Sequence, residues 1–351
     1  MISMKKIVLL LVSFITLTVL ISCKSSNVVE KTETVEGSNE NNKIKIVTTI
    51  YPEYDFVKNI IDGVEDKFDL QILMTSGVDL HNFQPTAKDI LDIGTADLFI
   101  YVGGESDKWV DGAINQAVNK NLKTLNLMEL LKDKIKVEEL KEGMEEEERH
   151  HDEEQDEEGE EHEHDGEEHE EEIEYDEHVW LSLNNASIIC TAIEEEIEKL
   201  DITRAGKYEE NLNAYLAELK TLNEEYKTVV KNASRKLLLF ADRFPFRYLV
   251  DDYGLDYYAA FKGCSAETEA SFKTIKFLSD KLGEEKLPYV LKIERSDDKI
   301  AKAVIENSEN KDAQIETMYS IQAVSDADIK SGETYLTYMR KNLEVLSRVL
   351  N

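Results

Sequence analysis

The chain has 351 residues, of which 74 are acidic and 41 are basic, so its formal net charge at pH 7 is -33. Apolar residues make up 41% of the sequence, which excludes wholesale disorder, and the 4 prolines and 15 glycines exclude collagen-like or proline-rich architecture. Because so negative a chain repels phosphate backbones, no nucleic-acid partner is expected, and cations are the natural ligands.

The first 22 residues have the features of an export signal. Lys5 and Lys6 precede an apolar run, residues 7–21, which is shorter than the roughly 20 residues that a membrane-spanning helix needs. The run ends in LISC, which resembles the lipobox of bacterial lipoproteins, where the peptide is cut before a cysteine that then carries lipid. We therefore expect residues 1–22 to be a lipoprotein signal peptide and Cys23 to be the lipidated residue. An uncleaved anchor is the alternative, and both outcomes place the body outside the cytoplasmic membrane.

A polar stretch without periodicity, residues 23–42, is expected to be a flexible tether, and the body of the chain follows it. Short β-rich runs then alternate with helical patterns, which predicts βα units around a parallel sheet in a first lobe, residues 43–202. The predicted strands are 43–50, 68–74, 97–103 and 123–127, and the predicted helices are 53–62, 88–95, 109–118 and 184–200.

An acidic loop, residues 144–177, interrupts this first lobe. Residues 145–177 contain 22 of the 74 acidic side chains and a single basic one, Arg149, so this tract dominates the net charge. Its composition predicts a solvated segment without a packed core. It also contains five of the seven histidines, which we expect to capture zinc weakly and exchangeably beside dense carboxylates: His150, His151, His162, His164 and His169.

The second half of the body begins with an unusually long helical pattern. Apolar and aromatic side chains recur at three- and four-residue steps over residues 203–232, without a proline or a glycine after Gly206. We prefer a single rigid helix, residues 203–234, that joins two lobes, and a coiled coil is the alternative. A second α/β lobe, residues 235–351, follows. Its predicted strands are 236–241, 256–261, 288–293 and 314–319, and its predicted helices are 246–252, 267–282, 298–307 and 334–350.

The predicted fold class is therefore α/β, with two lobes of parallel sheets joined by one long helix, and ligands are expected at the carboxyl ends of strands in the cleft between the lobes. Two histidines stand at such places. His81 falls in a loop directly after a strand, and His178 falls directly before a helix. Since neutral imidazole is the commonest metal ligand near pH 7, the sequence predicts a metal site at this pair.

Two cysteines remain beyond the one expected to carry lipid, too few for a fold built on disulfides. Cys190 lies in the apolar part of a predicted helix, where a small buried thiol is expected. Pairing between Cys190 and Cys264 stays open at this point.

Several motifs together resemble one family, the metal-binding lipoproteins of bacterial ABC importers for zinc and manganese. Residues 79–85 (DLHNFQP) match its D-x-H-x-x-x-P ligand loop, and residues 176–181 (DEHVWL) match its D-P-H-x-W-L ligand motif, with Glu177 in place of proline. Residues 263–271 are similar to its S-x-E-x-E-x-S region, and residues 335–342 to its closing helix, Y-L-x-x-M-x-x-N. The resemblance implies that His81 and His178 are metal ligands and that the acidic, His-rich loop is a zinc-type feature.

The sequence departs from this family at the third ligand. The family takes it from the second lobe, in a pattern such as H-x-A-F-x-Y-F, and the matching stretch here is ADRFPFRYL, residues 241–249. Arg243 falls at the ligand position, where a guanidinium offers no lone pair. We therefore predict that the adjacent Asp242 substitutes for it. An ion pair between Asp242 and Arg243, or a helix N-cap at Asp242, is the alternative. The fourth carboxylate of the family has no clear match in residues 319–322.

The resemblance implies an extracytoplasmic lipoprotein that captures Zn²⁺ and delivers it to the membrane subunits of an ABC permease, as a monomer anchored through Cys23 to the outer face of the cell membrane. Zinc is expected over manganese because imidazoles favour it. The alternatives are a manganese-type binding protein, a surface adhesin of the same family, and a metalloenzyme with an open zinc position. No H-E-x-x-H helix, nucleophile elbow or P-loop pattern supports an enzyme, so none is expected.

Overall fold

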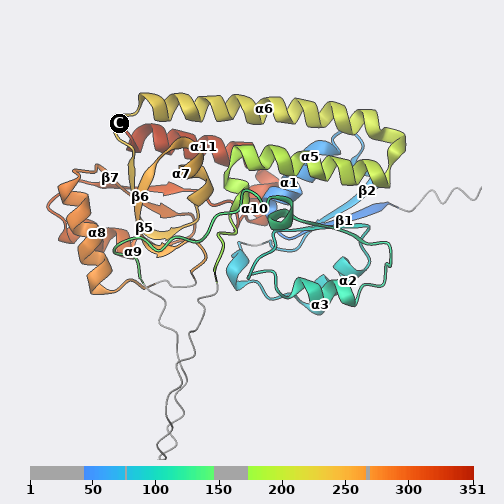
Figure 1. Cartoon of the computed structure of the whole chain (residues 1–351), viewed down its shortest axis with the longest axis horizontal. Helices are drawn as coiled ribbons and strands as arrows, with labels where there is room; N and C mark the ends of the chain where they lie inside the picture. Colours follow the sequence, from blue (N-terminus) through green and yellow to red (C-terminus); the bar gives the residue numbers. More distant parts are fainter. Residues whose placement is uncertain (1–42, 76, 146–172, 266–268) are drawn as a thin grey trace, which may run out of the picture. The chain divides into compact units, whose positions relative to one another are not determined.

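The computed structural model describes residues 43–75, 77–145, 173–265 and 269–351 (Figure 1). The predicted signal peptide, the tether with Cys23, and the five histidines of the acidic loop lie outside the described residues. None of the helices in these ranges combines the length and the apolar character that crossing a bilayer requires.

The first lobe is built on a parallel sheet with the strand order β2-β1-β3-β4. Its strands are β1 (Ile44–Thr48), β2 (Phe68–Ile72), β3 (Leu98–Tyr101) and β4 (Lys123–Asn126). Its helices are α1 (Tyr51–Ile60), α2 (Ala87–Gly94), α3 (Val110–Asn115), α4 (Leu127–Leu130) and α5 (Leu183–Leu200). Central strand residues such as Ile46 and Leu98 are fully buried, because helices cover both faces of a parallel sheet.

The second lobe repeats this topology, with the parallel order β6-β5-β7-β8. Its strands are β5 (Leu237–Phe244), β6 (Asp256–Lys262), β7 (Tyr289–Ile293) and β8 (Gln314–Met318). Its helices are α7 (Arg247–Tyr253), α8 (Phe272–Glu284), α9 (Lys299–Asn307), α10 (Asp326–Ser331) and α11 (Tyr335–Val349). The second strand of each lobe therefore lies at a sheet edge beside the first, and the predicted fold class is confirmed.

Helix α6 (Ala205–Asn232) is a single element of 28 residues, as predicted, and at 1.5 Å per residue it is about 42 Å long. It packs on α1 and α5 in the first lobe and on α11 and α7 (Figure 1), so it is not an isolated coiled-coil strand. Its periodic residues form the buried face: Tyr208, Leu212, Tyr215, Leu219, Leu222, Tyr226 and Val230.

Helix α11 is a second connection between the lobes, which the sequence reasoning did not anticipate. Near its start, the Tyr335 amide donates to the buried carboxylate of Asp55 in α1 over 3.1 Å, and the Tyr335 hydroxyl donates to the Trp180 carbonyl over 2.7 Å. Its far end lies in the second lobe, where the Leu350 carbonyl accepts the Ser234 amide. Figure 1 shows α11 running beside α6.

Local chemistry explains the clearest error in the predicted boundaries. Helix α8 begins at Phe272 and not at residue 267, because the Ser271 hydroxyl accepts the Thr274 amide and caps the helix there.

The sequence left open whether Cys190 and Cys264 form a disulfide, and in the structure they do not. Cys190 is a buried free thiol in α5, and Cys264 is a free thiol in the loop after β6.

The segments on either side of residues 146–172 form a strap, residues 134–145 and 173–177, that reaches from the first lobe to the second. Within the strap, Val137 and Tyr175 pair as an antiparallel bridge. The Glu145 amide donates to the Ala260 carbonyl at the edge of β6 over 2.9 Å, and Lys262 pairs with Glu174 over 2.7 Å. The strap therefore covers the β6 edge of the second sheet and ends directly before His178.

Candidate metal centre

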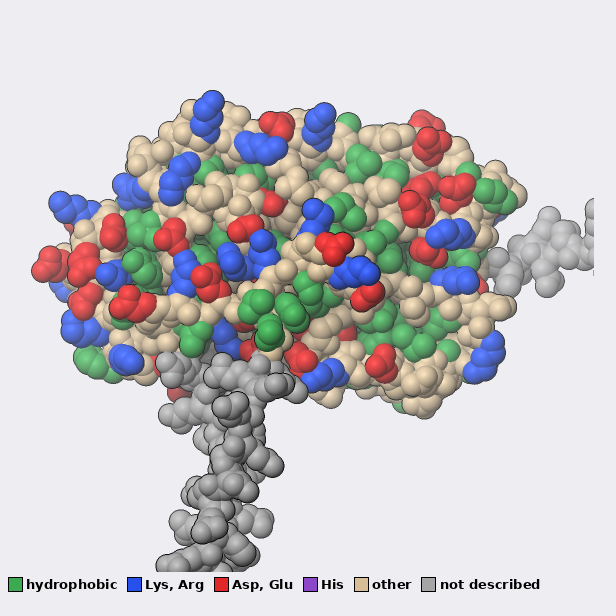
Figure 2. Space-filling view, in the orientation of Figure 1, with side chains coloured by type: hydrophobic (Ala, Val, Ile, Leu, Met, Phe, Trp, Pro, Cys, Tyr) green, Lys and Arg blue, Asp and Glu red, His purple; other side chains and the backbone are tan. Residues whose placement is uncertain are grey.

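Charged side chains of both signs are interspersed on the face shown in Figure 2, and no histidine is visible there among the described residues. The two histidines that the sequence singled out are instead enclosed. The His81 side chain is 5% exposed and the His178 side chain is 0% exposed. A buried imidazole needs partners for both ring nitrogens, so the surroundings of each ring decide what it can bind.

His81 is presented by a short 3-10 turn, Leu80–Asn82, in the loop after β2. Asp79 starts the turn, because its Oδ1 accepts the His81 backbone amide over 3.0 Å. The His81 Nδ1 lies 2.8 Å from the Ser106 hydroxyl, in the loop after β3. Since Nδ1 is engaged, Nε2 is the nitrogen left to bind a metal.

His178 is held by the carboxylate two residues before it. The Asp176 Oδ1 accepts the His178 backbone amide over 2.8 Å and lies 3.0 Å from the His178 Nδ1. Carboxylate–imidazole pairs of this kind fix the ring orientation of metal-binding histidines and leave Nε2 for the metal. The Nε2 atoms of His81 and His178 are 3.2 Å apart. The structure thus brings together the two histidines predicted from the sequence.

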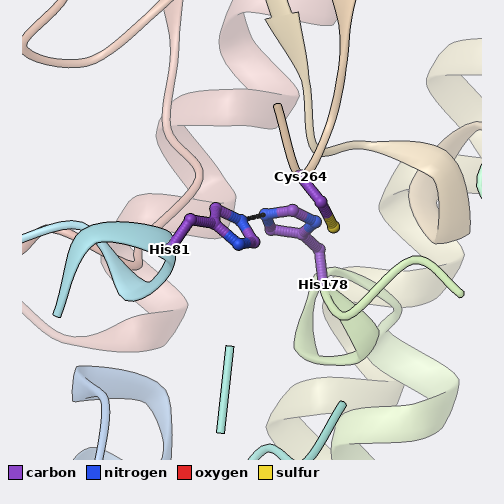
Figure 3. Close-up of side chains that lie close together, drawn as sticks. All are labelled: His81, His178 and Cys264. Carbon is purple, nitrogen blue, oxygen red and sulfur yellow. Dashed lines mark hydrogen bonds between the residues drawn. The ribbon is translucent and has the colours of Figure 1, made fainter. Parts of the chain in front are cut away.

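A third residue completes the group, and sequence reasoning did not include it. One ring nitrogen of His81, one of His178 and the sulfur of Cys264 all lie within 4.8 Å of one another (Figure 3). In the described ranges this is the one group of three histidine, cysteine or acidic side chains close enough to hold a metal ion. Cys264 comes from the loop after β6, so the group draws on both lobes. Its signal in the sequence was a thiol three residues after the end of a predicted strand, residues 256–261.

Glu177, which replaces the proline of the family motif, supports the His81 side of the group. Its Oε1 accepts the Ser106 amide over 2.9 Å, and its Oε2 lies 3.6 Å from the His81 Nδ1. This Oε2 is buried and has no hydrogen-bond partner among the described residues. The Glu177 carboxylate packs against Gly104, where a Cβ would lie 2.4 Å from Oε1 and where the φ of +81° would strain any other residue.

Burial and neighbouring charges shift the pKa values of the two histidines in opposite directions. Burial, together with the nearby His178, lowers the pKa of His81 to about 3, so His81 is neutral at physiological pH. Burial also disfavours the charged form of His178, but the carboxylates of Asp176, Glu138 and Glu177 outweigh it and raise the pKa of His178. Burial likewise raises the pKa of the Cys264 thiol well above its ordinary value. The Asp176 carboxylate, 3.0 Å from the His178 Nδ1, places a negative group beside the pair, which suits a cation.

Asp242, the predicted second-lobe ligand, is engaged elsewhere. Its Oδ1 accepts the Arg243 amide over 2.8 Å, and its Oδ2 accepts the Ile293 amide over 3.0 Å. The pairing of β5 with β6 shifts register between Phe240 and Arg243, and this bulge turns Asp242 toward the backbone of β7. Cys264, not Asp242, is the second-lobe residue that the structure brings to the two histidines.

The Arg243 side chain bridges the two lobes beside the centre, where its guanidinium pairs with Asp79 and not with the adjacent Asp242. Its guanidinium lies 2.5 Å from the Asp79 Oδ2 and donates to the Ser265 carbonyl over 3.2 Å. Gln322 donates to the same Asp79 oxygen over 3.0 Å. Asp79, Arg243 and Gln322 line a cleft of about 720 Å³ at the carboxyl ends of the strands of the second sheet. Residues 319–322, where the family's fourth ligand was sought, therefore contribute Gln322 as a partner of Asp79.

Comparison with known proteins places the chain among metal-binding relatives. A family model described as "Zinc-uptake complex component A periplasmic" matches residues 46–349. The high-affinity zinc uptake system protein ZnuA of Bacillus subtilis is 30% identical over 310 residues, which cover 88% of each chain. The zinc-binding protein AdcA of Streptococcus pyogenes is 28% identical over 316 residues, but the chain spans only 55% of the length of that relative. The crystal structure of the metal-dependent lipoprotein YcdH of Bacillus subtilis superimposes with a TM-score of 0.67 at 26% identity, covering 88% of this chain and 100% of that one.

Proposed function

The chain belongs to the family of periplasmic zinc-uptake components, and on that premise we propose that it captures Zn²⁺ outside the cytoplasmic membrane and delivers it to the membrane subunits of an ABC importer. In this role zinc is the cargo, and the protein is a binding protein without catalytic activity. The zinc-binding relatives support the cargo, and the family description supports the place in an uptake complex.

One observation carries this proposal: two buried imidazoles face each other through Nε2 at 3.2 Å, each with its Nδ1 already engaged. A tetrahedral Zn²⁺ with Zn–N distances of 2.0–2.1 Å sets two nitrogens about 3.4 Å apart. The pair is therefore close to the spacing that zinc requires before any metal arrives. Imidazole nitrogen also favours zinc over manganese, which prefers carboxylate and carbonyl oxygen.

For the parts of the chain outside the described residues, the proposal rests on the amino-acid sequence alone. We propose that residues 1–22 are removed and that Cys23 carries the lipid that anchors a monomer to the outer face of the membrane, with residues 23–42 as a tether. The loop 144–177 gathers zinc weakly near the tight site. The lobes span residues 43–202 and 235–351, and residues 203–234 link them.

Competition titration against a chromophoric zinc chelator tests the proposal. We expect one tight zinc equivalent in the full chain and its loss in the double variant His81→Ala with His178→Ala. The matched control, His162→Ala with His164→Ala, removes two imidazoles from the acidic loop and should leave the tight equivalent in place. Tight binding that survives in the first double variant would refute the assigned site.

A further inference from the structure

We propose that Cys264 is a metal ligand, so that the cargo is held by two imidazole nitrogens from the first lobe and one thiolate sulfur from the second. The inference rests on the proposed function, and it names a ligand that the family resemblance did not predict. It also defines the class of cargo more narrowly, as thiophilic divalent ions such as Zn²⁺ and Cd²⁺ and not Mn²⁺.

The geometry needs only a small adjustment. With a Zn–S distance of about 2.3 Å and a Zn–N distance of about 2.0 Å, a tetrahedral zinc sets sulfur and nitrogen roughly 3.5 Å apart. The ligand atoms of Cys264 and the two histidines already lie within 4.8 Å of one another. Closing the remaining gap takes a movement on the order of 1 Å, which a change of side-chain rotamer in a loop supplies.

The loop that carries the thiol is fixed on both sides of it. Before Cys264, Gly263 packs so closely that a Cβ would lie 2.8 Å from the Phe244 carbonyl oxygen. At Cys264, the backbone amide donates to the Glu138 Oε1 of the strap over 3.1 Å. After it, the Ser265 carbonyl accepts Arg243. The thiol is therefore held at the centre by glycine packing and by hydrogen bonds on either side.

Bonding to the metal converts the Cys264 thiol to a thiolate. When the metal–sulfur bond forms, the S–H bond breaks and the proton passes to solvent, so the thiolate neutralises one of the two positive charges of the ion.

The repeated topology gives an independent reason for the pairing. His81 follows β2 and Cys264 follows β6, and each of these strands is the second of its lobe and lies at the sheet edge beside the first. The two residues thus occupy equivalent loops in the two lobes. Two other second-lobe groups at the cleft are occupied, since the Asp242 carboxylate binds two backbone amides and the Arg243 guanidinium binds Asp79. Cys264 is the second-lobe donor in the group, and a fourth coordination position is left for water.

Cobalt absorption tests the ligand directly, because a thiolate bound to Co²⁺ gives a near-ultraviolet charge-transfer band that nitrogen and oxygen ligands do not give. The full chain, titrated with one equivalent of Co²⁺, should show this band. Cys264→Ser should abolish the band and weaken Zn²⁺ binding by at least tenfold, with little change in Mn²⁺ binding. The matched control is Cys190→Ala, which removes the buried thiol of α5 and should keep both the band and the affinity.

The outcomes separate this inference from the proposed function. A Cys264→Ser variant that keeps the band and the zinc affinity overturns the thiolate ligand, while loss of tight binding in the double histidine variant still supports zinc capture. If Cys264→Ser fails to fold, as judged by its circular dichroism and thermal melting, Cys264→Ala is read in its place. Tight binding that survives in both the cysteine and the double histidine variants overturns the whole centre.

Discussion

Replacing Asp176 by asparagine should weaken zinc binding without unfolding the protein. The Asp176 side chain is 1% exposed, and its Oδ1 contacts both the backbone amide and the Nδ1 of His178, over 2.8 and 3.0 Å. The backbone of Asp176 has separate partners, because its amide donates to the Lys136 carbonyl and its carbonyl accepts the Tyr248 hydroxyl. Asp176→Asn therefore keeps the shape of the motif and removes its charge.

The expected loss of zinc affinity follows from the role of the Asp176 carboxylate, which holds the His178 ring through its Nδ1. Removing the outer partner of a metal-binding histidine lowers metal affinity by about 10- to 100-fold, or about 1.4–2.7 kcal/mol. Because the pair is fully buried and the charge is lost entirely, we expect a value near the upper end. Competition titration at pH 7.5 measures it, and thermal melting checks the fold.

Asp251→Asn is the matched control, since Asp251 makes a surface pair with Lys136 at 2.5 Å and its side chain is 46% exposed. That substitution should leave zinc affinity within about twofold of the wild type, because exposed ion pairs are worth little. If Asp176→Asn also stays within twofold, the Asp176 carboxylate does not support a metal ligand, and the role of His178 fails with it.

Three further predictions concern stability and the acidic loop. Arg243→Ala should lower the free energy of unfolding by about 2 kcal/mol in urea titrations, because it leaves the partly buried Asp79 without its charged partner, and an effect below 0.5 kcal/mol would contradict this. Burial, aided by the charge of Glu177, raises the pKa of Asp107 to about 7, so the folded state holds a proton that the unfolded chain releases near its ordinary pKa of about 3.9. The stability that this bound proton contributes is full below about pH 4 and is lost as the pH rises through 7. The free energy of unfolding of Asp107→Asn relative to that of the wild type should therefore increase between pH 5 and pH 8, and a difference that stays constant would refute the argument. Deleting residues 146–172 should remove several weak zinc equivalents, counted by elemental analysis, and leave the tight one, whose disappearance would make the tract part of the main site.

The fold was largely predictable because its signals are local. The unbroken periodicity of residues 203–232 predicted α6, which begins only two residues later, at Ala205. Strand β5 was expected to stop at residue 241, where polar residues begin, and it continues to Phe244 because Arg243 and Phe244 still pair with β6 beyond the bulge. A bulge depends on the partner strand, so the sequence of one strand does not contain it.

The site was predictable only in part, because part of it depends on contacts distant in sequence. His81 and His178 were found through motifs that also contain Asp79 and Asp176, the residues that position them. Cys264 meets His81 only when the two lobes pack together. The same packing decides that Arg243 pairs with Asp79, and not with Asp242. The spacing of residues along the sequence predicts neither of these contacts.

Two helices running side by side, α6 and α11, make the connection between the lobes stiff. A pair of packed rods resists bending more than one rod, and both ends of α11 are tied, to Asp55 in one lobe and to Ser234 near the other. The site is thus preorganised, and binding spends little free energy on closing the lobes. On the proposed function, we expect residence time to depend on ligand exchange at the metal and not on a hinge, so that a transport partner would unload the protein by acting on the loops around the ion.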